Sequence, residues 1–137
     1  DIGLVDDDPH VFASTVVENV RLGRPGATDS EVEEVLRRVR LGPWIDNLEH
    51  GLDTWLGDGI ADVSGGERAR IGLARSLLSD QPVLVLDEPI AHLDSATAEL
   101  VAADLLDGAG ERSVVWITHS EIGLDRMDKV LDLGRAK

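Results

Sequence analysis

Three short groups of polar residues have types and spacings that suit phosphate chemistry. The first group consists of Ser64, Gly65, Gly66 and Glu67. Ser64 can cap a helix while Glu67 reaches back to the cap, which together form a capping box. Two glycines in the first turn weaken a helix, by about 1 kcal/mol each at interior positions, yet they leave backbone amides open to a phosphate. Plain helix capping and phosphate binding are therefore both open interpretations.

The second group is a pair of carboxylates directly after a hydrophobic run. The run is Val83, Leu84, Val85 and Leu86, and Asp87, Glu88 and Pro89 follow it. Asp87 is placed to hold Mg²⁺, usually through water. Glu88 is placed to polarise an attacking water molecule as a general base. The alternative is a solvated turn after a strand.

The third group is a single histidine, His119, which follows a second hydrophobic run over residues 114–118. Strand order places it beside the position expected for Glu88, where it can hydrogen-bond a γ-phosphate and orient a water molecule. A purely structural role is the alternative. His10 and His50 have no comparable setting, and we assign them structural roles.

These groups must be positioned by alternating strands and helices in the second half of the chain. The sequence predicts a helix over 64–79, a strand over 83–86, a helix over 95–106, a strand over 113–118, a short helix, and a last strand over 129–133. This alternation favours a parallel sheet with right-handed crossovers. The continuous apolar runs predict strands that are buried on both faces. Catalytic groups in such sheets lie at the carboxyl ends of the strands.

The first half begins with an apolar strand over residues 2–5 and is then mainly helical from 12 to 63. A short helix is predicted over 14–22. A stronger helix follows, because Val32, Val35 and Leu36 recur at helical spacing. Either Thr28 or Asp29 can cap it. Another short helix is predicted from Pro43 to Leu48. The expected fold is therefore α/β, with an α-helical subdomain inserted before the second half.

Composition excludes several classes of protein. The formal net charge of −14 repels polyanions, so nucleic-acid partners are not expected. The absence of cysteine excludes disulfides and cysteine-based zinc sites. No apolar run approaches the roughly 20 residues of a membrane span. The chain starts at Asp1 and its one methionine is Met127, so we expect it to be a fragment of a longer protein.

In order and spacing, the three groups resemble the motifs of the ATP-binding cassette (ABC) family. Residues 64–67 match its signature motif, with Glu67 where glutamine is commoner, and residues 83–88 match Walker B and the catalytic glutamate. Residues 91–94 resemble the D-loop, and His119 the switch histidine. The resemblance implies a partial P-loop NTPase-like sheet in three parts: a Q-loop strand region (1–12), a helical subdomain (13–63), and a signature helix with the catalytic core (64–137).

The resemblance also implies a mechanism shared by two such domains, which bind two ATP molecules at their interface. Ser64, Gly65, Gly66 and Glu67 would then contact the γ-phosphate of ATP bound mainly to the partner. Asp87 would hold Mg²⁺, and Glu88 and His119 would be the catalytic residues of this chain's own site. Asp94 would bridge the two subunits.

Two departures from the family pattern matter. The sequence has no G-x-x-x-x-G-K-[ST] loop, which is the chief phosphate cradle. We therefore expect this loop upstream of Asp1, and little ATP hydrolysis by the chain alone. The second departure is Asp7, which stands where the family's Q-loop glutamine is expected. Its carboxylate can still contact Mg²⁺ through water, but its charge is expected to alter coupling to the membrane domain.

The stretch from Phe12 to Val20 resembles that of ABC exporters, and Phe12, Trp44 and Trp55 either face the transmembrane part or pack locally. Within exporters, the chain is most similar to Cyd-type thiol exporters, which move cysteine or glutathione and support cytochrome bd assembly. That similarity implies a heterodimeric partner, a transmembrane domain and a place at the cytoplasmic face of the bacterial inner membrane. The alternatives are an exporter of lipid, drug or peptide, and a non-transport ABC ATPase.

Overall fold

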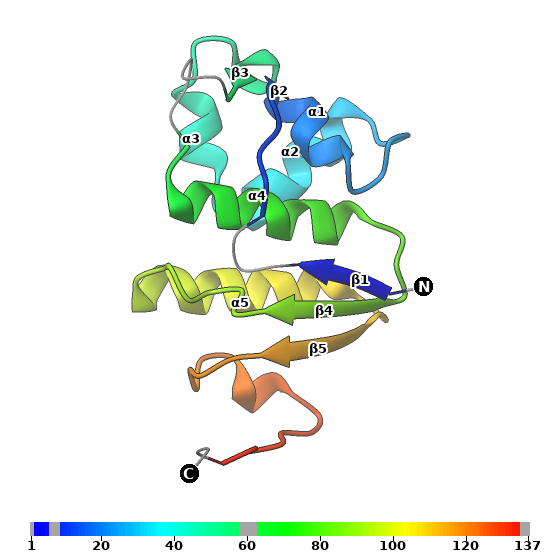
Figure 1. The fold of residues 1–137 in the computed structure, drawn as a ribbon, viewed down its shortest axis with the longest axis vertical. Helices are drawn as coiled ribbons and strands as arrows, with labels where there is room; N and C mark the ends of the chain where they lie inside the picture. The colour runs from blue at the N-terminus through cyan, green and yellow to red at the C-terminus, as the bar shows by residue number, and fades with distance from the viewer. Residues whose placement is uncertain (1, 6–8, 58–62, 135–137) are drawn as a thin grey trace.

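The computed structural model describes residues 2–5, 9–57 and 63–134, and its fold is α/β. Figure 1 shows a small sheet with one long helix behind it, and a second long helix that separates the sheet from a group of short helices. This arrangement confirms the predicted class, a parallel sheet with a helical part inserted between its first and second strands.

The sheet has three parallel strands in the order β1-β4-β5. Their bounds are Ile2–Val5 for β1, Val83–Asp87 for β4 and Ser113–Ile117 for β5. Leu86 of β4 is level with Val5 on one side and with Trp116 on the other. All three strands therefore end at the same edge of the sheet, as parallel pairing requires.

Only one face of the sheet is covered by the described residues. Leu84 and Leu86 are 1% and 2% exposed, whereas Val115 and Ile117 are both 49% exposed. Burial of β5 on both faces was therefore predicted wrongly, and Val83 of β4 is only half-buried as well. The physical reason is that a parallel sheet needs helices on both sides to bury both faces. Figure 1 shows α5 behind the sheet and no described helix in front of it.

Two long helices pack against this sheet and run alongside each other. Their bounds are Gly65–Leu78 for α4 and Ser95–Ala109 for α5. Both confirm helices expected from the sequence, although α5 continues past the predicted end at Leu106. Ile71 of α4 and Val101 of α5 are fully buried in the core that joins the helices to the strands.

The remaining elements form the helical group above α4. Their bounds are Ser14–Thr15 for β2, Val16–Arg21 for α1, Asp29–Arg38 for α2, Gly42–Asp46 for α3, Gly51–Asp53 for the 3₁₀ helix η1 and Trp55–Leu56 for β3. Thr28 caps α2 in a capping box with Glu31, which settles the two predicted caps in favour of threonine. None of the described helices combines the length and apolar character needed to cross a membrane.

The last predicted strand, over residues 129–133, is wrong. These residues are exposed and adopt no regular structure. Among the described residues after β5, the only element is the 3₁₀ helix η2, Leu124–Arg126, which takes the place of the expected short helix. A strand needs a hydrogen-bonded neighbour. β5 pairs with β4 alone among the described strands, so residues 129–133 have no described strand to pair with.

A partly buried arginine, Arg112, joins the carboxyl ends of the two long helices. The guanidinium of Arg112 donates to the carbonyl oxygens of Ser76, Leu77 and Ser79 at the end of α4, at 2.8–3.2 Å. It also donates to the carbonyls of Gly108 and Ala109 at the end of α5. Helix ends carry unpaired carbonyls that need such donors. Arg112 therefore fixes the carboxyl end of α4 to α5.

Gly72 in α4 lies against the segment that follows β1. A Cβ added at Gly72 would lie 2.6 Å from Cγ of Pro9, whereas one added at Gly66, in the same helix, meets nothing closer than 3.8 Å. We expect Gly72→Ala to destabilise α4 by about 1–3 kcal/mol through overpacking. Gly66→Ala should instead stabilise it, by up to about 1 kcal/mol through helix propensity.

The measurement is the opening free energy of α4 from amide hydrogen exchange in the full-length protein. Shifts of the same sign for Gly72→Ala and Gly66→Ala would contradict the close packing of Pro9 on α4.

Candidate functional site

The predicted polar groups meet at one end of the molecule, which we call the carboxyl edge: the carboxyl ends of the three strands and the N-termini of α4 and α5. Figure 1 shows the arrowheads of β1, β4 and β5 pointing toward this end, where both helices begin. In open α/β sheets, ligands bind outside the carboxyl ends of the strands. We therefore expect a ligand site at the carboxyl edge.

At the start of α4, Ser64 and Glu67 form the predicted capping box. The hydroxyl of Ser64 accepts a hydrogen bond from the Glu67 amide at 3.2 Å, and the Glu67 carboxylate accepts one from the Ser64 amide at 2.8 Å. A Cβ at Gly65 would meet nothing within 4 Å. Packing thus does not explain the glycine. Open space before a helix N-terminus is what phosphate binding requires.

Asp87 ends β4 and is only half-buried. Its carboxylate has no hydrogen bond or ion pair with a described residue, so both oxygens are available. The described residues contain no group of three or more side chains that would hold a metal by themselves. Mg²⁺ is usually bound through one or two carboxylates together with phosphate oxygens and water. Asp87 fits that mode of binding.

Glu88 has a backbone conformation that the sequence does not announce. Its φ is 48°, and among the described residues only Arg40 is another non-glycine residue with positive φ. The amide of Glu88 donates to the carbonyl of Ile117 at 2.8 Å, which continues the β4–β5 pairing into this turn. A left-handed residue with a side chain costs about 1–2 kcal/mol, and such strain often marks functional sites.

His119 and Glu88 lie side by side, as strand order predicts. Nε2 of His119 is 3.5 Å from Oε1 of Glu88, and the two side chains are 99% and 21% exposed respectively. The Glu88 carboxylate is therefore partly shielded while the imidazole projects into solvent. A carboxylate and an imidazole at this distance can share a water molecule or a phosphate oxygen between them.

Asp94 caps α5, a role that the sequence reading missed. Its carboxylate accepts hydrogen bonds from the amide and the hydroxyl of Thr97, at 3.0 and 2.8 Å. The hydrogen bond from the Thr97 amide is the main reason that the pKa of Asp94 lies below its ordinary value. The aspartate–threonine spacing of an N-cap was available as a signal. The side chain is exposed, so capping leaves it accessible to a partner.

Arg70 is a second residue at the carboxyl edge that the sequence reading missed. Its guanidinium donates to the carbonyls of Gly66 and Arg40, at 3.2 and 3.3 Å. Burial lowers its pKa, and the negative charges of Glu67 and Asp94 partly offset that effect. The guanidinium nevertheless stays charged in proteins. Arg70 thus brings a positive charge between the N-termini of α4 and α5.

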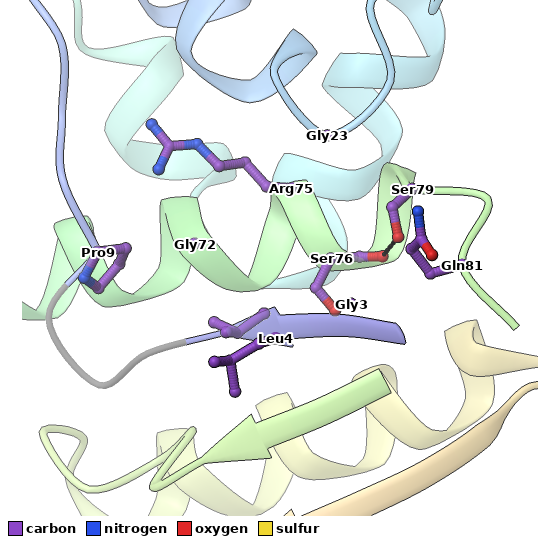
Figure 2. A pocket seen from close by; sticks show the side chains of 10 residues that line it. Gly3, Leu4, Pro9, Gly23, Gly72, Arg75, Ser76, Ser79 and Gln81 are labelled. Carbon is purple, nitrogen blue, oxygen red and sulfur yellow. Dashed lines mark hydrogen bonds between the residues drawn. The ribbon is translucent and has the colours of Figure 1, made fainter. Parts of the chain in front are cut away.

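Asp7, the predicted Q-loop residue, lies outside the described residues. A cavity of about 310 Å³ between β1 and α4 is lined by Gly3, Gly72, Ser76 and Gln81 among others, and by none of the predicted site residues (Figure 2). The buried oxygens Oγ of Ser76 and Oε1 of Gln81 have no described partner. The cavity therefore suits ordered water.

Fold and site together define a nucleotide-binding α/β domain, and comparison with known proteins gives the family. The sequence model of the ABC transporter family matches residues 1–91. The chain therefore belongs to the ABC transporter family.

Individual relatives agree with this assignment. The chain is 34% identical over 136 residues to the glutathione/L-cysteine transport system ATP-binding/permease protein CydD of Bacillus subtilis, covering 99% of this chain and 24% of that protein. It is 37% identical over 130 residues to CydC of Escherichia coli, which has the same descriptive name, covering 95% and 22%. The chain thus spans about a quarter of the length of the curated relatives it matches.

A solved structure has the same fold. It is a bacterial Atm1-family ABC exporter with ATP bound, at a TM-score of 0.78 and 31% sequence identity, covering 87% of this chain and 21% of that one. At this identity and TM-score the similarity extends over most of the described elements.

The strain at Glu88 can be tested by comparing glycine with alanine. Both Glu88→Gly and Glu88→Ala remove the carboxylate, but only alanine keeps the Cβ that the left-handed backbone disfavours. We expect Glu88→Gly to be more stable than Glu88→Ala by about 1 kcal/mol, measured as the opening free energy of amides 86–90 by hydrogen exchange.

Glu99, an exposed residue inside α5, is the matched control. There the order should be reversed, with glycine less stable than alanine by about 1 kcal/mol. The same order at both positions would show that Glu88 is unstrained.

Proposed function

We propose that this chain is the C-terminal portion of the ATP-hydrolysing domain of an ABC exporter. The observation that carries the proposal is the contact of Glu88 with His119 at the carboxyl edge, next to Asp87, whose carboxylate has no partner among the described residues. Such a domain hydrolyses ATP by transfer of the γ-phosphoryl group to water, which depends on positioning and charge stabilisation. The three-part division at residues 1–12, 13–63 and 64–137 belongs to this proposal.

Each site residue has a role in this scheme. Asp87 holds Mg²⁺, which neutralises phosphate charge when bound. Glu88 accepts a proton from the attacking water, and His119 orients that water and contacts the γ-phosphate. Asp7, which lies outside the described residues, would contact the same metal through water.

The remaining residues act on a second domain packed head to tail with this one. The amides and hydroxyl of Ser64, Gly65 and Gly66, aligned by Glu67, hold the γ-phosphate of ATP bound mainly to the partner domain. The open space in front of Gly65 supports this role over plain capping. Asp94 bridges the two subunits from its exposed position at the start of α5.

We further propose that the complete protein exports a thiol, cysteine or glutathione, from the cytoplasmic face of a bacterial inner membrane. It would work as a heterodimer with transmembrane domains, without a nucleic-acid partner, and in support of cytochrome bd assembly. The names of two relatives, CydD and CydC, support the thiol. A relative named as a putative multidrug export protein in Staphylococcus aureus supports a second candidate, an exporter of another substrate.

The test of the catalytic assignment is Glu88→Gln in the complete protein. We expect ATP turnover to fall about 10²–10⁴-fold, the usual contribution of a general base, while ATP binding is retained because the amide keeps the shape of the carboxylate. Steady-state phosphate release and equilibrium nucleotide binding measure the two effects. Glu99→Gln is the control. Near-normal turnover in Glu88→Gln would refute Glu88 as the base.

The test of the substrate uses inside-out membrane vesicles that contain the complete protein and its partner subunit. We expect ATP-dependent accumulation of radiolabelled cysteine or glutathione, abolished by Glu88→Gln. ATP-dependent accumulation of a lipid or drug with no thiol uptake would favour the second candidate. An upstream coding sequence without apolar spans would exclude an exporter altogether.

A further inference from the structure

Arg75 connects α4 to a segment far away in the sequence. Its guanidinium donates to the carbonyl of Asn19 at 2.7 Å, to the side-chain Oδ1 of Asn19 at 3.1 Å, and to the carbonyl of His10 at 2.8 Å. Figure 2 shows the side chain leaving α4 on the side opposite β1. One rigid, planar group therefore joins α4 to both ends of the segment 10–19.

Asn19 in turn closes that segment into a compact loop. It is completely buried, its side-chain amide donates to the carbonyls of Phe12 and Thr15 at 3.0 and 2.9 Å, and its Oδ1 accepts from the Phe12 amide at 2.8 Å. Together with the hydrogen bond that Oδ1 accepts from Arg75, these bonds give both the nitrogen and the oxygen of the side-chain amide a partner. Segment 10–19 therefore moves as a unit with whatever holds Asn19.

The outer surface of this unit is aromatic and accessible. The rings of His10 and Phe12 meet edge to face with centroids 4.5 Å apart, and the Arg75 guanidinium lies 6.0 Å from the Phe12 ring centroid. Phe12 is 49% exposed. The exposed His10–Phe12 pair thus lies next to the guanidinium of Arg75, the residue of α4 that holds the segment 10–19.

Partial burial of the Arg75 guanidinium costs free energy, so stability of the fold alone does not explain an arginine at this position. Burial lowers its pKa, and no carboxylate among the described residues offsets that effect. Arg75 is half-buried, and a cation that is partly removed from water without a carboxylate partner loses hydration that no opposite charge replaces. The gain from an arginine is directional bonding: three oxygens in two parts of the chain are held in fixed geometry.

We propose that Arg75 is a positioning residue that transmits movement of the phosphate-binding end of α4 to the His10–Phe12 surface. Gly65, at the start of α4, and Arg75 lie on one continuous helix, so the two ends cannot move independently. The proposal rests on the proposed function, because phosphate contact at residues 64–66 is what would move α4. ATP binding then changes the conformation of the His10–Phe12 surface, which lies outside the ATP site.

The experiment compares amide hydrogen exchange of the full-length protein with and without trapping by ATP, Mg²⁺ and orthovanadate. In the unmodified protein, we expect trapping to change exchange in residues 64–70 and, about tenfold, in residues 10–19. In Arg75→Lys, which keeps the charge but lacks the planar fork that reaches Asn19 and His10 together, the change at 64–70 should persist. The change at 10–19 should fall below about twofold.

Arg112→Lys is the matched control. Arg112 is also a partly buried arginine bonded to backbone carbonyls of α4, but it has no contact with residues 10–19. We expect both regions to respond to trapping in this variant. Asn19→Ser removes the side-chain acceptor of Arg75 and should reproduce the effect of Arg75→Lys. Having both variants keeps the test valid if one of them fails to fold.

The outcomes separate the two proposals. A full response at 10–19 in Arg75→Lys or Asn19→Ser, with nucleotide trapped, would overturn the role of Arg75 and leave the proposed function intact. Failure of the unmodified protein to trap nucleotide would overturn both. Loss of the response in Arg112→Lys as well would show that general loosening of α4, and not Arg75, carries the effect.

Discussion

The parallel pairing of β4 with β5 is the constraint on which the candidate site depends. Because both strands end at the same level, the residues that follow them are neighbours although they are 31 positions apart, as Glu88 and His119 show. The hydrogen bond from the Glu88 amide to Ile117 extends this pairing by one residue and holds the left-handed turn. A shift of one residue in register would separate the carboxylate from the imidazole.

The predictable parts of the fold are those that nearby residues decide. Thr28 and Ser64 cap their helices through residues three positions further on, and that spacing is visible in the sequence. The apolar runs of β4 and β5 likewise predicted strands, and the order of the strands predicted the contact of Glu88 with His119. Local chemistry and the rules of parallel sheets were sufficient for these features.

The features that sequence reading missed depend on distant contacts. An apolar run shows that a strand can be buried, but not whether a helix lies over each face, so the exposure of Val115 was not foreseen. Residues 129–133 include Val130, Leu131 and Leu133, which suit a strand, yet no described strand pairs with them. The positive φ of Glu88 is set by Ile117, and the contacts of Arg75 lie 56 and 65 positions away. None of these leaves a local pattern.

The fastening of the end of α4 by Arg112 gives the helix unequal ends. At 1.5 Å per residue, Gly65 lies about 18 Å from the anchored carbonyls near Leu77, whereas Arg75 lies only about 3 Å from them. If the rigid helix turns about that end, Gly65 moves far and Arg75, close to the fixed end, moves little. A displacement of 3 Å at the glycines then becomes about 0.5 Å at Arg75, with a correspondingly greater force. The displacement at Arg75 is smaller than at the glycines, and the force there is larger. A small, strong displacement suits the packed contact between Arg75 and residues 10–19.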